Sequence, residues 1–202
     1  MLLELEPPYL VIKPGVSEAE FYALEGEDSD WEYLDGRLVM SPASDRHEDL
    51  FGFLSSLLRL FLDERGGGVV RGSRTPMRLD ERWSPEPDLL VVGSARAHRL
   101  TPKYLDGPAD LVIEIVSEAD PRFEVREKLP RYQQAGIPEI WLIDPANRQL
   151  SVHWLEGAAY HQATATTGRL EARTVPGFWI EVDWLWQEKL PSTFDCLRRV
   201  LG

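Results

Sequence analysis

The feature that most constrains the fold is a set of short stretches that contain almost no polar residue. They include "LLVV" at 89–92, "LVIEIV" at 111–116 and "IWLI" at 140–143. Each has the length and the aliphatic side chains of a strand that is buried on both faces. We therefore predict a central sheet with helices covering both of its sides.

A helix long enough to cover such a sheet is predicted at 45–65. Its apolar side chains recur at helical spacing, at Leu50, Leu54, Leu57, Leu58 and Phe61. We expect Asp45 to cap the start of this helix and Gly66 to end it. A second helix is expected to end near Gly136.

Further elements are predicted on either side of these segments. Ser17 with Glu20 is a capping-box pattern and indicates a short helix at 17–24. The Asp35-Gly36 pair between "WEYL" and "RLVM" indicates a tight hairpin. The remaining predicted segments are a strand at 69–79, a hairpin at 149–166 and a closing stretch at 171–186. This order predicts an α/β fold, with a mixed central β-sheet flanked by helices and additional β-hairpins.

Length and composition favour one domain in a reducing compartment. A chain of 202 residues can bury a sizeable core, and its single cysteine, Cys196, cannot form an internal disulfide. The first residues carry acids where a signal peptide carries bases, and no stretch reaches the length of a membrane span. We predict a single cytoplasmic domain over 1–202 without a membrane segment, with its core at about 16–186 and a C-terminal tail at 187–202.

The charge of the chain limits how it could bind nucleic acid. The formal net charge is −12, which argues against a broad electrostatic coat of the kind that general nucleic-acid binders carry. Arg71, Arg74 and Arg78 recur along the predicted strand at 69–79 and could still contact a phosphate backbone. A solvent-facing stripe on a strand would give the same pattern.

Glu114 is the anomaly inside the apolar stretches. An ionised carboxylate among aliphatic neighbours needs a cation, hydrogen-bond donors or a proton. If the 88–92 and 111–116 strands pair antiparallel, Asp88 comes close to Glu114. Two acids in one pocket repel each other, and a divalent metal relieves the repulsion, with Mg²⁺ favoured by this ligand set. The structural alternatives are an arginine partner for Glu114 and a turn role for Asp88.

Lys128 is the cation that we expect nearest to these acids. It follows Glu114 by 14 residues, on the next helix or its entry turn. An ammonium there could orient an attacking water and offset the charge of a phosphate, whereas the alternative is a solvent-exposed helix lysine. Pro130 fits only the first turn of a helix, so we expect this helix to start near residue 127. Tyr132, one turn further on, is expected to pack in the core.

Three segments in a fixed order carry a resemblance to a known family. "PDLLVV" at 87–92, "PADLVIEIVS" at 108–117 and "EKLPRYQQAGIPEIWLIDP" at 127–145 resemble the Uma-two family of restriction-endonuclease-like proteins, within the PD-(D/E)XK nuclease superfamily. The segment "WEYLDGRLVMSP" with a following histidine resembles the N-terminal signature of that family. The resemblance covers roughly 16–186 and implies a restriction-endonuclease-like fold.

The resemblance also implies roles for individual residues. It implies that Asp88 and Glu114 bind Mg²⁺ (or Mn²⁺) and that a lysine acts beside them. The superfamily usually has this lysine two residues after the second acid, where this chain has Val116. The family pattern instead matches Lys128, on the next helix.

Two further residues match the family pattern. Glu32, before the main helix, is marked as an additional acid that would support the metal shell, and its alternative is an exposed strand acid. His47 lies at the start of the main helix, where a phosphate contact or a plain helix-start histidine is favoured over a metal ligand.

The sequence leaves hypotheses from different classes open. The first is a Mg²⁺-dependent endonuclease that hydrolyses DNA. Its catalytic residues would be Asp88, Glu114, Lys128 and Glu32, with His47 and Arg74 as substrate contacts. The second is a catalytically inert nuclease fold that serves binding or assembly, which the acidic charge favours. Hydrolysis of a smaller phosphate compound is a third. A homodimer is also expected, because many cleaving nucleases pair and "FDCLRRVLG" at 194–202 could form a contact helix.

Overall fold

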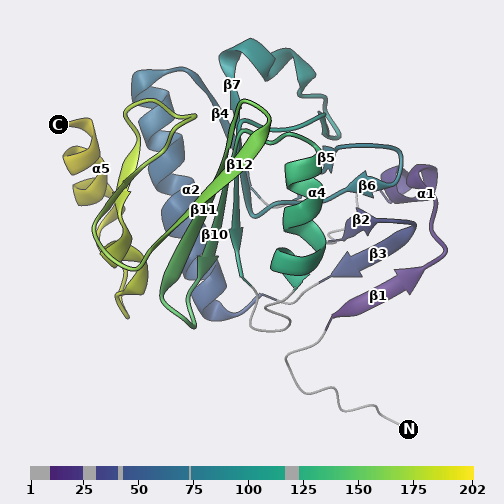
Figure 1. Ribbon diagram of the computed structural model, residues 1–202, viewed down its shortest axis with the longest axis horizontal. Helices are drawn as coiled ribbons and strands as arrows, with labels where there is room; N and C mark the ends of the chain where they lie inside the picture. The colour runs from purple at the N-terminus through teal and green to yellow at the C-terminus, as the bar shows by residue number, and fades with distance from the viewer. Residues whose placement is uncertain (1–9, 25–30, 41–42, 73, 117–122) are drawn as a thin grey trace, which may run out of the picture.

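The computed structural model shows a mixed α/β fold built around a six-stranded sheet (Figure 1). The structure describes residues 10–24, 31–40, 43–72, 74–116 and 123–202. The strand order is β12-β11-β10-β9-β7-β4. The strands are β4 (Gly68–Gly72), β7 (Leu89–Gly93), β9 (Leu111–Ile115), β10 (Glu139–Asp144), β11 (Gln149–Glu156) and β12 (Ala159–Ala165). The predicted fold class is confirmed.

Two helices cover the central strands from opposite sides. The strands β9 and β10 pair parallel, and the other neighbours in the sheet pair antiparallel. Helix α2 (Asp45–Arg65) covers one face and α4 (Leu129–Gln134) covers the other (Figure 1). Every residue of β9 is buried. This explains the near-continuous apolar stretches, because a strand covered on both faces has no solvent-facing side.

The N-terminal part forms a second, smaller sheet beside α4 (Figure 1). Its order is β1-β3-β2-β6, with β1 (Val11–Pro14), β2 (Glu32–Leu34), β3 (Arg37–Met40) and β6 (Trp83–Ser84). The predicted hairpin joins β2 to β3, and Asp35 and Gly36 both have positive φ angles, 50° and 76°. The predicted capping box is present at Ser17, before α1 (Glu18–Ala23).

The remaining elements are short and lie around the two sheets. They are β5 (Met77–Arg78), η1 (Ser94–Arg99), β8 (Leu105–Asp106), η2 (Glu124–Lys128), β13 (Arg169–Glu171), β14 (Trp179–Glu181), η3 (Val182–Trp186) and α5 (Thr193–Leu201). Among the described residues, no helix is long and apolar enough to cross a membrane. The predicted strand end at Ser117, the signature residues Ser41 and Pro42, and the acids before residue 10 lie outside the described residues.

Two local predictions were wrong. Ser44, not Asp45, caps α2, because its hydroxyl accepts a hydrogen bond from the His47 N–H, while Asp45 is the first helical residue. The single strand predicted at 69–79 is two strands, since β4 ends at Gly72 and β5 begins at Met77. Pro76 has no N–H for a strand ladder, which favours a break at this point. Gly66 ends α2 as predicted.

The C-terminal helix α5 packs against α2. Its apolar face, Cys196, Leu197 and Val200, belongs to the core that α2 and the central sheet form. The Arg65 side chain at the end of α2 donates a hydrogen bond to the Leu201 carbonyl. Cys196, Leu197 and Val200 are therefore covered within the protein, whereas Phe194 of the same helix is exposed, and the contact between copies through this helix stays a prediction.

Candidate active site

Asp88 and Glu114 lie at the same end of two neighbouring strands. In the antiparallel pairing of β7 with β9, Leu89 lies opposite Ile113, which puts Asp88, one residue before β7, opposite Glu114. The Asp88 Oδ2 atom accepts a hydrogen bond from the Ile115 N–H at 2.6 Å. The predicted pairing of the strands is thus confirmed. It brings the two carboxylates to the same end of the sheet.

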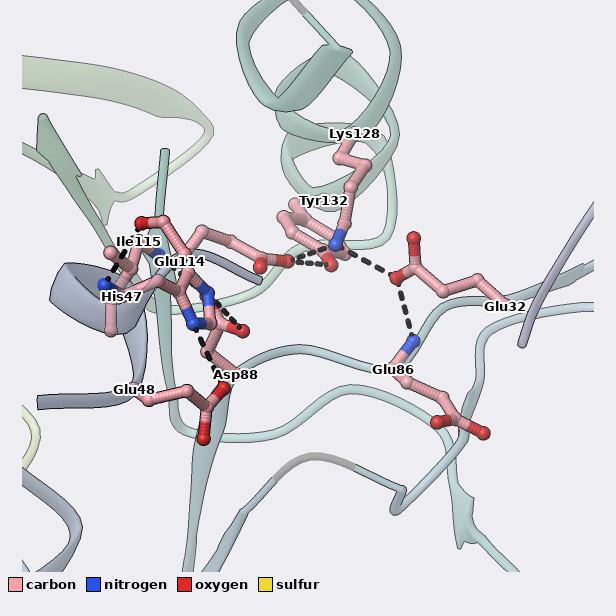
Figure 2. Close-up of polar contacts among 10 residues, drawn as sticks. Glu32, His47, Glu48, Glu86, Asp88, Glu114, Ile115, Lys128 and Tyr132 are labelled. Carbon is pink, nitrogen blue, oxygen red and sulfur yellow. Dashed lines mark hydrogen bonds and ion pairs between the residues drawn. The ribbon is translucent and has the colours of Figure 1, made fainter. Parts of the chain in front are cut away.

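The Glu114 side chain points away from α2 and toward α4. Leu111, Ile113 and Ile115 belong to the apolar cluster on the α2 side, so the intervening Glu114 faces the opposite side. Its Oε1 atom accepts a hydrogen bond from the Tyr132 hydroxyl at 2.5 Å and lies 2.6 Å from Lys128 Nζ (Figure 2). The partner of this buried acid is therefore a lysine and not an arginine.

The surroundings of Glu114 favour its neutral form when no ion is bound. Burial raises the pKa of Glu114 to about 8, the charge of Lys128 opposes this shift, and the charges of Asp88 and Glu32 add to it. The pKa of Tyr132 is also raised, first by burial and second by the negative charge of Glu114. Tyr132 therefore stays a hydroxyl donor to this carboxylate.

Lys128 connects two carboxylates that are far apart in the sequence. Its Nζ atom lies 2.6 Å from Glu114 Oε1 and 2.8 Å from Glu32 Oε1 (Figure 2), and its side chain is 5% exposed. The solvent-exposed alternative for this lysine is thereby excluded. Because an ammonium this deeply buried needs an anionic partner, Glu32 supplies the negative charge, and Glu114 adds to it in its ionised form.

The helix that carries Lys128 begins earlier than predicted. Phe123, the first residue described after 116, is already helical, and the turn η2 has π geometry before α4 begins at Leu129. Pro130 lies in the first turn of the α segment, directly after the π turn, and not at the start of the whole helix as predicted. The chain changes from π geometry, which pairs residues five apart, to α geometry just before the proline.

Glu32 is held by two donors at the start of β2. Its Oε1 atom accepts a hydrogen bond from the Glu86 N–H at 2.9 Å, in addition to the ion pair with Lys128 (Figure 2). Its side chain is 13% exposed, so it is not the exposed strand acid that was the alternative. The backbone at Glu86 is a contact that the sequence did not point to.

His47 contacts the opposite side of Asp88. Its Nε2 atom lies 3.0 Å from Asp88 Oδ1, whereas its Nδ1 atom is buried, makes no hydrogen bond and lies 3.4 Å from Glu48 Oε1 (Figure 2). Burial lowers the pKa of His47, but the hydrogen bond to Asp88 and the charges of Asp88 and Glu48 outweigh it and raise the pKa overall. His47 beside Asp88 therefore holds its proton more readily than an ordinary histidine.

Tyr132 has a polar role that the sequence interpretation did not assign. It was expected to pack in the core, and it is fully buried there. Its hydroxyl also donates to Glu114. The available signal was its i, i+4 spacing from Lys128, which places both side chains on the same helix face.

The three arginines do not form the predicted stripe. Arg71 is exposed in β4, and Arg78 in β5 pairs with Glu18 at 2.6 Å. Arg74 lies between these strands, is exposed and has a φ of 75°. The prediction that the three arginines recur along one strand was therefore wrong. The role of Arg74 as a substrate contact stays a prediction.

The donor atoms at this site are of the type that Mg²⁺ prefers. No group of three His, Cys, Asp or Glu side chains in the described part of the chain is arranged to hold a metal ion. Mg²⁺, however, commonly uses one or two protein carboxylates and completes its shell with water and phosphate. The carboxylates of Asp88 and Glu114, which the strand register brings to the same end of the sheet, are donors of this type, so the chemistry of the residues present fits a hard divalent cation.

The fold and these side chains define a restriction-endonuclease-like protein, with a mixed sheet, opposed acids at one end and a lysine from the following helix. The sequence profile of the Uma2 family, described as "Putative restriction endonuclease", matches residues 18–183. The chain belongs to this family.

One solved structure is similar over most of both chains. It is the crystal structure of "a putative nuclease belonging to DUF820" from Anabaena variabilis, with a TM-score of 0.68 and 16% sequence identity. The match covers 85% of this chain and 97% of that chain, which supports the fold. No curated protein matches the chain significantly.

Proposed function

We propose that this protein is a Mg²⁺-dependent (or Mn²⁺-dependent) endonuclease that hydrolyses phosphodiester bonds in DNA. The observation that carries the proposal is the position of Lys128 Nζ, 2.6 Å from Glu114 and 2.8 Å from Glu32, beside the opposed Asp88. Membership of a restriction-endonuclease-like family supports the same reaction class. The cytoplasmic location stays a prediction from the single cysteine.

The charges of the cluster favour a divalent cation. Fully ionised, Asp88, Glu114 and Glu32 carry three negative charges and Lys128 carries one positive charge, which leaves −3 + 1 = −2. Asp88 and Glu114 would hold the ion. When bound, it would stabilise charge on the phosphate and lower the pKa of a water. The ion would also return Glu114 to its carboxylate form, because a nearby positive charge favours ionisation.

The other residues would position the substrate and the acids. The Lys128 ammonium would face the phosphate as a positive charge, with Glu32 holding it in place. The Tyr132 hydroxyl fixes the orientation of Glu114. His47, in the first turn of α2, would contact a phosphate, because the N–H groups at the start of a helix favour anions.

The decisive experiment incubates the purified protein and supercoiled DNA with Mg²⁺ or Mn²⁺. We expect nicked and linear products with the wild type and none with Glu114→Gln, which keeps the shape of the side chain and removes its charge. The matched control is Glu64→Gln, the same change on an exposed residue of α2. Cleavage that persists in Glu114→Gln would contradict the proposal.

A second candidate is a nuclease fold that binds without cutting. It is favoured by one observation: both Asp88 oxygens already have partners, the Ile115 N–H and His47, while Lys128 occupies the space between Glu114 and Glu32. Calorimetric titration with Mn²⁺ separates the two candidates. Heat of binding that disappears in Asp88→Asn supports the endonuclease, and no binding by the wild type supports the inert module.

A further inference from the structure

The strand β12 forms an open edge of the six-stranded sheet. It pairs with β11 on one side, and no other strand among the described residues pairs with it. In Figure 1 it crosses in front of α2, at one border of the sheet. Residues 161–164 are all exposed, although successive side chains point to opposite faces. Both faces and the outer edge of this strand are therefore accessible.

The direction of the free backbone groups follows from the strand register. The Leu155 N–H donates to the Pro138 carbonyl at 2.9 Å, so the odd-numbered residues of β11 face β10. The backbone groups of its even-numbered residues therefore point toward β12, where they pair with odd-numbered residues. The remaining residues, Tyr160, Gln162 and Thr164, thus direct both the N–H and the C=O away from the sheet.

An indole hydrogen bond marks where this open edge ends. The Trp186 Nε1–H donates to the carbonyl of Thr166 at 2.8 Å. Thr166 follows Tyr160, Gln162 and Thr164 at the same two-residue spacing, so its carbonyl would also point outward. The outward carbonyl just beyond β12 is thus hydrogen-bonded within the protein, whereas the outward N–H and C=O groups of β12 itself remain available for pairing.

The open edge lacks the features that prevent strand pairing. Natural sheet edges are commonly protected by charged residues, prolines or bulges. Residues 157–168 contain no Asp, Glu, Lys, Arg or Pro, the longest stretch without a charged residue in a chain with net charge −12. The opposite edge, β4, is shorter and carries Arg71 together with glycines at both ends. A second copy can therefore approach β12 without bringing like charges together on the two strands.

We infer that β12 is a homodimer surface, at which two copies pair their β12 strands antiparallel about a two-fold axis at Gln162. In this register Gln162 lies opposite Gln162 of the second copy. Tyr160 then lies opposite Thr164, and Thr164 opposite Tyr160. All three are pairs of outward-facing residues, and each exchanges two hydrogen bonds. The register is self-complementary, as a two-fold interface requires.

This dimer keeps the two candidate active sites apart. The two sheets join into one of 6 + 6 strands, and the β10, β11 and β12 strands of both copies lie between the two β9 strands. Seven strand spacings of about 4.8 Å separate the sites by roughly 34 Å. An interface limited to a strand edge is small, so we expect an association that depends on protein concentration. The inference does not rest on the proposed function.

The test is sedimentation equilibrium of the full chain over a range of concentrations. We expect the wild type to reach twice the chain mass of 23.1 kDa. Gln162→Lys and Gln162→Glu each place like charges opposite each other at the axis, so each alone is expected to remain at 23.1 kDa. An equimolar mixture of the two variants should dimerise again, because opposite charges then meet. The control Gln134→Lys makes the same change at the exposed end of α4 and should dimerise like the wild type.

Each outcome decides the inference. A wild type that stays monomeric at every concentration overturns it, as does a Gln162→Lys variant that dimerises like the wild type. Assemblies larger than two copies would contradict a dimer in which the two β12 strands pair only with each other. Recovery in the mixture shows that both variants are folded and that residue 162 meets its own counterpart. The masses are measured without DNA, so a failure of the cleavage assay leaves this result intact.

Discussion

Two buried glutamates on neighbouring strands have opposite surroundings. Glu114 in β9 is 2% exposed, and Glu139 at the start of β10 is fully buried. Glu139 accepts hydrogen bonds from the Trp141 indole and, on its other oxygen, from the Arg173 and Thr174 N–H groups and the Thr174 hydroxyl, all at 2.8 Å. Glu114 instead meets an ammonium and a hydroxyl, with Asp88 and Glu32 nearby.

Burial alone therefore does not mark a catalytic acid. Glu139 has four neutral donors and links β10 to residues 173–174, which is a structural role. Glu114 belongs to a cluster with excess negative charge, which is stable only with a cation, a proton or both. The set of partners, and not the apolar sequence around the acid, separates the two roles.

The largest difference is expected from Glu114→Gln in a cleavage assay. Loss of one charged group at the reaction centre should reduce the cleavage rate about 10²–10³-fold. The free energy of unfolding should fall by only about 1 kcal/mol, because the amide oxygen can still accept from Tyr132 and Lys128, and Glu32 remains the anionic partner of the ammonium. Initial rates on supercoiled DNA and urea denaturation measure the two effects. A large loss of stability would mean that Glu114 is structural, like Glu139.

The opposite pattern, a loss of stability with an unchanged cleavage rate, is expected from Glu139→Gln. An amide can accept from only one side, so N–H groups of Arg173 or Thr174 lose their acceptor, and the free energy of unfolding should fall by about 2–4 kcal/mol. The cleavage rate per folded molecule should not change. Urea denaturation and initial rates are again the measurements. An unchanged stability would remove the contrast between the two acids.

A smaller effect on both quantities is expected from Tyr132→Phe. The change removes the hydroxyl that orients Glu114 and leaves the ring in the core, at a cost of about 1 kcal/mol in unfolding free energy. Cleavage should slow by about tenfold, because Lys128 still holds the carboxylate. Tyr160→Phe, which removes a hydroxyl bonded to the Ile137 carbonyl, is the matched control for stability and should leave cleavage unchanged. Equal cleavage rates in both variants would show that Tyr132 only packs.

The smallest effect concerns His153, which pairs with Ile140 next to Glu139. Burial lowers the pKa of His153 below its usual 6.5. Below that value the unfolded chain binds a proton that the folded chain does not, so stability falls as the pH falls. Lowering the pH from about 7.5 to about 5.5 should therefore destabilise the wild type more, or stabilise it less, than it does His153→Gln, because the raised pKa values of Glu114 and His47 act in both proteins. The exposed control, His98→Gln, should keep the wild-type difference.

Much of the fold could be predicted because it depends on local patterns. The capping box at Ser17, the turn at Asp35-Gly36 and the end of α2 at Gly66 each follow from the conformations that a few adjacent residues allow. The errors were local as well. Ser44 and Asp45 are both good cap residues, and only the helix hydrogen bonds choose between them.

The site could be predicted in part. The position of Asp88 opposite Glu114 needed one assumption, the antiparallel pairing of two adjacent strands, and this pairing is found. The hydroxyl of Tyr132 and the donors around Glu139 could not be predicted, because a side chain's partners on other elements leave no periodic pattern in its own segment.

The sequence by itself determined the strands buried on both faces, the long amphipathic helix and an acid in a position where it could not stay unpaired. The tertiary structure alone decided which groups would be its partners. Glu32 and Lys128 are 96 residues apart and lie on different elements, yet they meet within 2.8 Å because the small sheet and α4 pack beside the same end of the central sheet. Local patterns specify elements and their faces, whereas contacts between distant elements depend on how all of them fill one core.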